Sequence, residues 1–386
     1  MTDEFVAMKT SATKPYIAFF PRFSRMGASS RYRCFQFLPW LRDSGISFSV
    51  FPLFGDGYLQ RRYRGEGWPV ALMFRAYITR IRALKQLPRN IPLWIEKELF
   101  PWLPYAFEEI FLRERRYIMD MDDCVFDVYR RYPILRDKFA KLAHRAFEIH
   151  VGNRELADDA GRYSSGQVHI FPTVLSTGEY QQKQIVSGAD HLLPVTERQE
   201  CGMQGVLKGT KPLILGWIGS PLSQCHLEQF FPVLERLTKA AGIPVELHCM
   251  GTGSQFPGAL PQKHFAWSSE AEKKFCSQVD VGIMPLGVHD LSRGKCGFKL
   301  LQFMAAGVPV VASDSRANRD ILEDGSRGFL AKSPEDWQNA LRTLCLSSDA
   351  RRIFGNAGKE RVLHAYSLNS WAPRWCNAVM HVINAG

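Results

Sequence analysis

The stretch KCGFKLLQFMAAGVPVVAS, residues 295–313, predicts a basic loop, a short helix, a Gly-Val-Pro turn and a buried strand in immediate succession. Lys295 and Lys299 lie four residues apart at the expected start of the helix, where backbone N–H groups are free to bind an anion. Residues 308–312 are apolar throughout, which is typical of a parallel strand buried on both faces. Because α/β proteins bind nucleotides where helices start beside strand ends, the stretch predicts an α/β fold with a site for an anion such as a diphosphate.

The length and the alternation of segments indicate two domains. The chain has 386 residues, of which 46% are hydrophobic, and this is more than one ordinary core accommodates. Short apolar runs alternate with amphipathic segments, as in βαβ units with a parallel sheet. Residues 173–211 are polar and lack periodicity, so we place the linker there. The predicted domains are residues 1–195 and 208–365.

The apolar runs and helical periods predict individual elements. The predicted strands are 16–20, 47–52, 117–121, 148–151, 168–171, 213–218, 245–250, 280–284, 308–312 and 328–330. The predicted helices, apart from the one that follows Lys295, are 30–44, 70–87, 138–145, 154–163, 225–241 and 334–347.

Cysteine usage and the N-terminus predict a cytoplasmic protein. The nine cysteines show no CxxC pair and no metal-ligand spacing, which is typical of reduced thiols inside the cell. No apolar run approaches the roughly 20 residues of a membrane span, and the first residues do not resemble a secretion signal.

The net charge of +11 is uneven, and residues 61–89 contain eight basic residues against one acid. From Val70 to Leu87 the apolar residues fall on one side and the basic residues on the other. Such a helix either lies on an anionic membrane surface or packs on the core with a solvated basic face. Recognisable nucleic-acid-binding motifs are missing from the sequence, so no nucleic-acid partner is expected.

The segment GASSRYR, residues 27–33, follows the first predicted strand. Gly27 allows a ligand to approach the backbone, and Ser29 or Ser30 is suited to cap the next helix. Arg31 and Arg33 add cationic groups. The segment predicts one wall of a binding site, although an ordinary strand-to-helix turn has the same layout.

Three carboxylates, Asp120, Asp122 and Asp123, follow directly on the strand predicted at 117–121. Catalytic groups of α/β proteins usually stand at such strand ends, and crowding raises the pKa of at least one carboxyl group. We prefer a cluster that binds acceptor hydroxyls and assists their deprotonation. A metal-binding Asp-x-Asp, a two-metal phosphoesterase and simple helix capping are the alternatives.

Glycine-containing turns end the first two strands of the second half. Gly219 and Ser220 offer a backbone N–H group and a hydroxyl to a phosphate, and Gly251 follows the second strand. A tight turn without a ligand is the alternative reading.

Taken together, residues 27–33, 248–254, 280–286 and 295–313 resemble family 4 glycosyltransferases of the GT-B fold. The resemblance implies two Rossmann-like domains that face each other across a cleft, with the segment 368–386 forming a helix that crosses back to the first domain. It implies transfer of a sugar from a nucleotide-diphosphate sugar to a hydroxyl of a glycan or lipid-linked acceptor. The resemblance further implies that the transfer retains the anomeric configuration and needs no metal or cofactor. It also implies a role in the synthesis of cell-envelope polysaccharide.

The same resemblance assigns Lys295, Phe298, Lys299 and Gln302 to the donor, together with the glycine turns and residues 27–33. The chain departs from the family at Gly294 and Gln302, where the family carries two glutamates. These departures leave a catalytically weak nucleotide-sugar-binding protein open, as well as a GT-B relative such as an epimerase or a phosphorylase.

Overall fold

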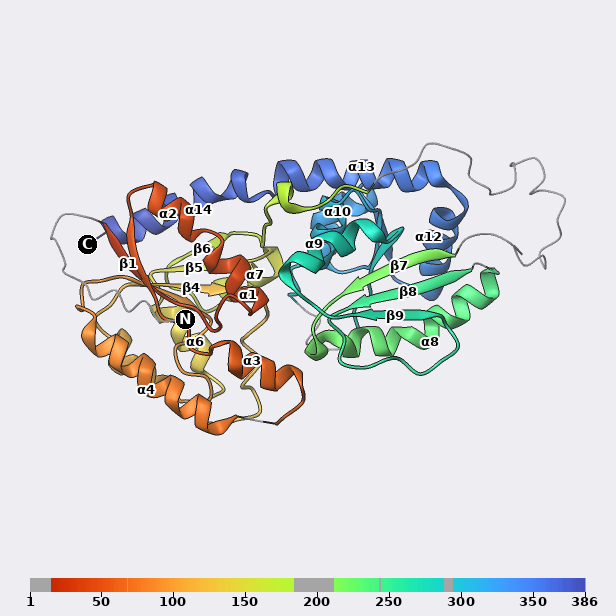
Figure 1. The fold of residues 1–386 in the computed structure, drawn as a ribbon. Coiled ribbons are helices and arrows are strands. Elements are labelled where there is room, and N and C mark those ends of the chain that lie inside the picture. Colours follow the sequence, from red (N-terminus) through yellow and green to blue (C-terminus); the bar gives the residue numbers. More distant parts are fainter. Residues whose placement is uncertain (1–14, 68, 184–211, 243, 288–293, 386) are drawn as a thin grey trace.

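The structure is a computed structural model and describes residues 15–67, 69–183, 212–242, 244–287 and 294–385. The described chain forms two halves side by side, each built on a parallel six-stranded sheet with helices on both faces (Figure 1). The predicted domain boundary between 195 and 208 lies outside the described residues.

The first sheet has the strand order β2-β1-β3-β4-β5-β6, and every adjacent pair is parallel. Its strands are β1 Tyr16–Phe20, β2 Ser47–Val50, β3 Leu93–Glu96, β4 Tyr117–Met121, β5 Glu148–Val151 and β6 Gln167–Ile170. The central strands β3, β4 and β5 are buried along their whole length. Burial on both faces fits the apolar positions of these strands, and the polar residues among them are buried as well, namely Glu96, Asp120, Glu148 and His150.

The second sheet has the order β12-β11-β10-β7-β8-β9 and is also parallel. Its strands are β7 Leu213–Ile218, β8 Val245–Met250, β9 Gln262–Phe265, β10 Val281–Met284, β11 Val310–Ser313 and β12 Phe329–Ala331. Residues 294–296, between β10 and α10, contact the first half, and doubly wound sheets bind ligands at such connections after their strands.

Helices connect the strands in both halves. In the first half they are α1 Ala28–Ser30, η1 Arg31–Phe35, α2 Leu38–Asp43, α3 Asp56–Tyr63, α4 Val70–Gln86, α5 Tyr105–Leu112, α6 Lys138–Arg145 and α7 Arg154–Gly161. After them come η2 Thr177–Glu179, η4 Pro221–Ser223, α8 Gln224–Ala241, α9 Ser269–Gln278, α10 Phe298–Ala305, α11 Arg316–Leu322, η6 Glu323–Gly325, α12 Pro334–Leu346, α13 Ser348–Ala365 and α14 Leu368–Asn384.

The single helix predicted over 30–44 is wrong, because this segment is broken into three pieces. Between α1 and α2 the chain makes a π-helical turn, in which Gln36 N donates to Arg31 O at 3.0 Å. Pro39 then lies in the first turn of α2, where its missing N–H group is not needed. The wider turn carries Arg33 into the interior of the molecule, where it is 3% exposed.

Helix α4 differs from its predicted packing at its first turns. Val70, expected on the core side, is 69% exposed, and Phe74 is 68% exposed. Arg80, by contrast, is buried and donates from its guanidinium group to the carbonyl oxygens of Leu99, Pro21 and Phe51. The first half of the helix therefore carries apolar side chains away from the core.

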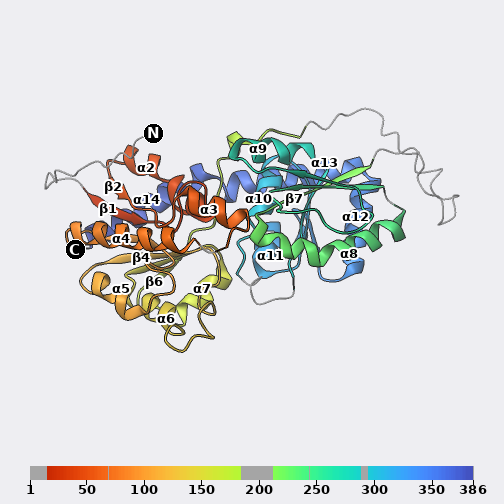
Figure 2. The same ribbon diagram turned by 60° about the horizontal axis from the view of Figure 1, so that its bottom comes forward.

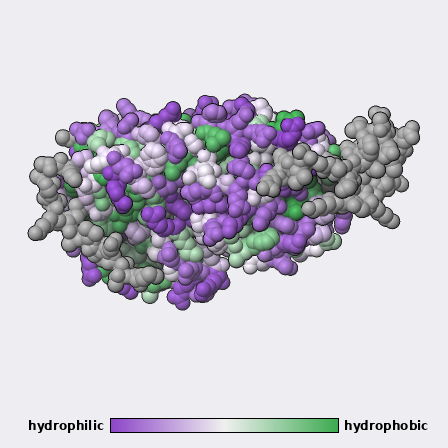
Figure 3. Space-filling model, turned by 45° about the horizontal axis from the view of Figure 1, so that its top comes forward, coloured by the Kyte–Doolittle hydropathy of each residue, from purple (hydrophilic) through white to green (hydrophobic). Residues whose placement is uncertain are grey.

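Two segments connect the halves and lie side by side. Leu368 N donates to Leu175 O at 2.8 Å, and Leu175 N donates to Tyr366 O at 3.2 Å. Helix α14 then packs on the first sheet, with the Trp375 ring stacked 4.6 Å from Phe37 and 5.8 Å from Phe19. The predicted return of the C-terminal helix is confirmed. The face along which α13 and α14 run is mostly hydrophilic, with scattered hydrophobic residues (Figure 3).

Candidate active site

The two halves meet along the carboxyl ends of their sheets. Helices α7 and α11 face each other across this boundary (Figure 2), with Arg316 paired to Asp158 and Arg154 placed 3.6 Å from Asp320. The candidate site lies next to these pairs, where the end of β4 meets the loop before α10.

Asp120 is the innermost of the three predicted carboxylates and is fully buried in β4. Its oxygens accept from Arg33 Nε at 2.9 Å and from an Arg33 terminal nitrogen at 2.7 Å. Burial raises the pKa of Asp120 to about 6, although the Arg33 guanidinium opposes the shift. Arg33 and Asp120 therefore pair with each other beneath the site, and their bidentate contact fixes η1 against the end of β4.

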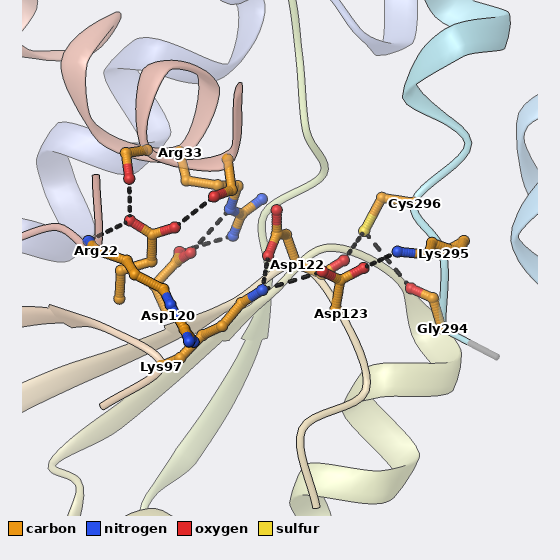
Figure 4. A network of polar contacts seen from close by, with 12 residues as sticks. Arg22, Arg33, Lys97, Asp120, Asp122, Asp123, Gly294, Lys295 and Cys296 are labelled. Atoms are coloured by element: carbon orange, nitrogen blue, oxygen red, sulfur yellow. Dashed lines mark hydrogen bonds and ion pairs between the residues drawn. The ribbon is translucent and has the colours of Figure 1, made fainter. Parts of the chain in front are cut away.

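Asp122 and Asp123 lie beside this pair, and the carboxylate of Asp123 reaches Lys295 of the second half (Figure 4). Lys97 Nζ is 2.8 Å from Asp122 Oδ1 and 3.0 Å from Asp123 Oδ2. Lys295 Nζ donates to the other Asp123 oxygen at 2.9 Å. Asp123 therefore bridges an ammonium group from each half of the molecule.

The charges of this cluster support one another. Burial on its own would raise the pKa of Asp123, but Lys97 and Lys295 together hold it well below its ordinary value. Burial opposes the charge of Lys295, and Asp123 outweighs it and raises the pKa of that ammonium group. The carboxylate and both lysines are ionised at neutral pH.

Cys296 fits tightly between the two halves. Its thiol donates to Asp122 O at 3.0 Å, and Asn153 Nδ2 donates to Gly294 O at 2.9 Å. A side chain at Gly152 would place its Cβ 2.2 Å from the Cys296 sulfur, so only glycine leaves room for this contact. The loop that carries Lys295 is thereby held against the ends of β4 and β5.

Lys299 differs from Lys295 because the described residues offer it no carboxylate partner. It is half-buried in the first turn of α10, and its Nζ lies 4.3 Å from the centre of the Trp217 ring. Burial and the nearby Lys295 lower the pKa of Lys299 to about 7. A cation–π contact compensates only part of the lost hydration, so this ammonium group favours an anionic partner.

The serines of segment 27–33 do not cap a helix, contrary to the sequence-based prediction. The N-cap position of α1 is occupied by Gly27, so no side chain caps this helix. Ser29 and Ser30 lie within α1 and donate their hydroxyls to the buried carboxylate of Glu96. Both serines hold α1 against the end of β3.

Arg31 extends toward the second half, as expected for a residue of the facing wall. Its guanidinium carbon lies 4.7 Å from the centre of the Tyr32 ring and 4.8 Å from that of Trp267. Glu272 of α9 is 4.0 Å from Arg31 and accepts from the Tyr32 hydroxyl at 2.9 Å. The structure brings Arg31 into the contact between the halves.

The glycine turns of the second sheet pack against each other. Gly251 has φ +80°, and a Cβ there would lie 2.1 Å from Gly219 O. Ser220 N donates to Ser223 Oγ at 3.0 Å. The two turns therefore need glycine for close packing, whatever ligand they contact.

Phe298 and Gln302 lie on α10 but in different surroundings. The Phe298 ring is 4.1 Å from the Tyr32 ring, at the contact between the halves. Gln302 is 2% exposed, and its Nε2 is 3.4 Å from the Tyr180 hydroxyl. A direct bond from Gln302 to a ligand requires this interior contact to rearrange.

Sequence reasoning missed the charged residues at the end of β3 and directly after it. Glu96, Lys97 and Glu98 form a charged run directly after the apolar Leu93-Trp94-Ile95, and such a run at a strand end was the available signal. In the described part of the chain, no group of three or more His, Cys, Asp or Glu side chains is arranged to hold a metal ion. None of the described helices is long and apolar enough to span a membrane.

The comparisons with known proteins agree with this architecture. The sequence model of the family described as "Glycosyl transferases group 1" matches residues 213–347. The "Putative glycosyltransferase EpsD" of Bacillus subtilis (strain 168) is 29% identical over 93 residues, which are 23% of this chain and 24% of that protein. The chain thus matches about a quarter of the length of this relative.

Solved structures are similar over nearly the whole chain. Sucrose-phosphate synthase from Thermosynechococcus elongatus is 13% identical with a TM-score of 0.65, covering 97% of this chain and 100% of that one. WaaG, a glycosyltransferase involved in lipopolysaccharide biosynthesis, is 14% identical with a TM-score of 0.62, covering 96% and 100%. A glycosyltransferase from Rickettsia africae ESF-5 is 11% identical, also with a TM-score of 0.62, covering 97% and 100%. The chain has the two-domain GT-B fold, and its second domain carries the sequence pattern of group 1 glycosyl transferases.

Proposed function

We propose that the chain is a glycosyltransferase that moves a sugar from a nucleotide-diphosphate sugar to an acceptor hydroxyl, with retention of configuration and without a metal or cofactor. Lys299 is the observation that carries this proposal. It is a half-buried ammonium group at the start of a helix, beside Lys295 and without a carboxylate partner among the described residues. A diphosphate supplies the missing negative charge at that place. The match of residues 213–347 to group 1 glycosyl transferases supports this assignment.

Different residues of the site would act on the leaving diphosphate and on the acceptor hydroxyl. The bond between the sugar and the diphosphate breaks, and Lys295, Lys299 and the first N–H groups of α10 stabilise the charge that develops on the leaving diphosphate. Asp122 and Asp123 on the facing wall accept hydrogen bonds from acceptor hydroxyls and the proton that the reacting hydroxyl loses. Contact between the halves excludes water, which limits hydrolysis of the donor.

Binding of nucleotide sugars by the purified protein tests the donor assignment. A thermal-shift screen across UDP-, GDP- and other nucleotide sugars should reveal at least one ligand. Lys299→Ala should weaken its binding at least tenfold, about 1.4 kcal/mol, whereas Lys141→Ala on the exposed face of α6 should not. Equal affinities in the two variants would remove Lys299 from the site.

Transfer to an acceptor tests the other wall. Asp122→Asn should lower transfer more than it lowers nucleotide binding, because the proposal places Asp122 on the acceptor side. A variant that loses only nucleotide affinity would contradict this role. Full activity in the presence of a chelator is expected, and its loss would favour the metal-dependent alternative.

The second candidate is a nucleotide-sugar-binding protein with little turnover. Gly294 and Gln302 stand where the resembled family has glutamates, Gly294 is held by Asn153, and Gln302 is buried beside Tyr180. Donor binding without any transfer or hydrolysis would favour this candidate. Product analysis would identify an epimerase or a phosphorylase.

We also propose that the protein works at the inner face of a membrane, on glycan or lipid-linked acceptors of the cell envelope. On α4, the exposed apolar side chains of Val70 and Phe74 lie in the same helix as exposed Arg75, Arg82 and Lys85. Apolar and basic side chains together suit a surface of anionic lipids.

Vesicle binding tests this proposal. Wild-type protein should sediment with anionic vesicles, and neutralising Arg75, Arg82 and Arg89 or replacing Phe74 by serine should release it. Neutralising Lys141 on α6 should leave binding unchanged. A wild-type protein that stays in the supernatant at low salt would refute membrane binding.

A further inference from the structure

Lys97 occupies a backbone conformation that lysine rarely adopts. Its φ is +65°, and Glu98 N donates to Glu96 O at 2.8 Å across it, which closes a three-residue γ-turn. The γ-turn with positive φ at its centre is the rare and strained form. Glycine would adopt it at no steric cost, so the lysine at this position calls for a reason.

Buried contacts on both sides force the turn into this shape. Glu96 is 1% exposed and accepts from Arg22 N at 2.8 Å and from two serine hydroxyls of α1. Glu98 is also 1% exposed and accepts from Lys138 Nζ at 2.7 Å and from the Tyr129 hydroxyl at 3.0 Å. Because both neighbours are anchored in the interior, the turn directs the Lys97 side chain toward Asp122 and Asp123.

The ammonium group of Lys97 meets both acids of the candidate site. It lies 2.8 Å from Asp122 Oδ1 and 3.0 Å from Asp123 Oδ2, and its side chain is 11% exposed (Figure 4). Lys295 takes the remaining oxygen of Asp123 from the other half of the molecule. Asp122 is paired with Lys97 alone among the described lysines and arginines, whereas Asp123 is shared.

The proposed function requires Lys295 to change partner. A donor diphosphate carries more charge than one carboxylate and attracts the Lys295 ammonium group away from Asp123. Asp123, whose side chain is 38% exposed, would then have no cation beside it if Lys97 were not there, and the neighbouring carboxylate of Asp122 would repel its charge. Lys97 remains in place during this exchange because its backbone is fixed in the first half.

We propose that Lys97 is a positioning residue of the transfer reaction, whose ammonium group holds the carboxylates of Asp122 and Asp123 in place while Lys295 moves from Asp123 to the donor diphosphate. The inference rests on the proposed function and deepens it. It explains why a strained lysine stands in the γ-turn, since glycine lacks the ammonium group.

Carboxyl carbon NMR of protein labelled in its aspartates tests the proposal without any turnover. Asp122→Asn and Asp123→Asn assign the two signals, and inorganic pyrophosphate serves as the probe for the diphosphate. In the wild type the Asp123 carboxylate should stay ionised at pH 6 with and without pyrophosphate, because Lys97 lowers its pKa. In Lys97→Met the Asp123 signal should titrate at higher pH than in the wild type, and pyrophosphate should move its titration to still higher pH, because Lys97 and Lys295 are the groups that lower its pKa.

Two further variants make the outcome decisive. Lys97→Arg keeps the charge and should behave as the wild type, whereas Lys141→Met should change nothing. If Lys97→Met does not fold, Lys97→Met/Asp122→Asn removes one charge of each sign and serves instead. An Asp123 signal whose titration does not move to higher pH with pyrophosphate in either charge-removing variant would overturn the proposal.

Turnover of a nucleotide sugar gives an independent measurement. In Lys97→Met, kcat should fall at least tenfold while KM changes less than threefold, and Lys97→Arg should restore most of kcat. Equal losses in binding and turnover would point to a purely structural lysine and overturn the proposal. If pyrophosphate does not change the carboxyl signals of the wild-type protein, the proposed diphosphate site is contradicted instead. The titrations without pyrophosphate would still show the effect of Lys97.

Discussion

Donor binding is predicted to take up a proton at Lys299. Burial and Lys295 lower the pKa of Lys299 to about 7, so at neutral pH about half of the molecules carry a neutral amine there. A diphosphate next to the amine favours its charged form and returns the pKa toward the ordinary value of about 10.4. Because the pKa is low in the free protein and high in the complex, binding is strongest below pH 7 and weakens as the pH rises.

The size of the effect follows from the two pKa values. Between pH 7 and pH 9 the charged fraction of free Lys299 falls from about one half to about one in a hundred, which weakens binding about 50-fold, or about 2.3 kcal/mol. Lys295 does not add to this trend, because Asp123, against the effect of burial, raises the pKa of its ammonium group. The slope should approach a factor of ten per pH unit above pH 8.

Isothermal titration calorimetry measures both the affinity and the proton. A nucleotide sugar is the ligand of choice, since its diphosphate is substituted at both ends and does not titrate in this range. Comparing buffers with different ionisation enthalpies should show uptake of about half a proton at pH 7 and about one proton at pH 8.5. Lys299→Arg is always charged and should bind with a flat pH profile. A wild-type affinity that is constant from pH 7 to pH 9 would refute the reasoning.

The remaining predictions concern the supports of the site. Arg33→Met leaves the buried carboxylate of Asp120 without its cation and should lower the free energy of unfolding, measured in guanidinium, by about 3–5 kcal/mol. A decrease as small as that caused by Arg113→Met, at an exposed position, would show that the Arg33–Asp120 pair does not stabilise the fold. Trp375→Ala should cost about 3–5 kcal/mol by leaving a cavity under α14, and an unchanged denaturation midpoint would contradict that packing. Gly297→Ala would place a Cβ 2.3 Å from an isoleucine methyl at φ +63° and should weaken nucleotide binding more than Gly325→Ala, which lies in open space at φ +100°; equal affinities would refute it.

Several strands were predictable because apolar residues dominate their sequences, as in YIMDM of β4 and LILGWI of β7. The bounds of β1, β4, β5, β7 and β8 are those that the apolar runs predicted, as expected for parallel strands covered on both faces. The edge strand β9, with the sequence QKHF, has no such signal, because its side chains are only partly covered. Strand β3 was missed since it has four residues and ends in Glu96, whose burial depends on serines 66 and 67 positions away.

The pairing of the site residues was not predictable in the same way. The sequence separately indicated Asp123 as an acid at a strand end and Lys295 as a base at a helix start. Their contact joins residues 172 positions apart and depends on how the two halves meet, about which local patterns carry no information. The contacts of Lys97 with Asp122 and Asp123 were not predicted for a related reason. They depend on a turn with positive φ at Lys97, which is fixed by contacts between residues distant in sequence.

The contact between the halves uses the groups that the proposed reaction needs. In the structure Asp123 neutralises Lys295, so a carboxylate occupies the role that the proposal gives to a phosphate. For Lys295, binding of a diphosphate would therefore exchange one ion pair for another instead of desolvating a free ammonium group, which would lower the electrostatic cost of binding. The same exchange leaves one oxygen of Asp123 free to accept from an acceptor hydroxyl, at the moment when the donor is in place. In the proposed reaction, donor binding and preparation of the acceptor side would thus be linked through the single carboxylate of Asp123, and this link would favour transfer only after both substrates are bound.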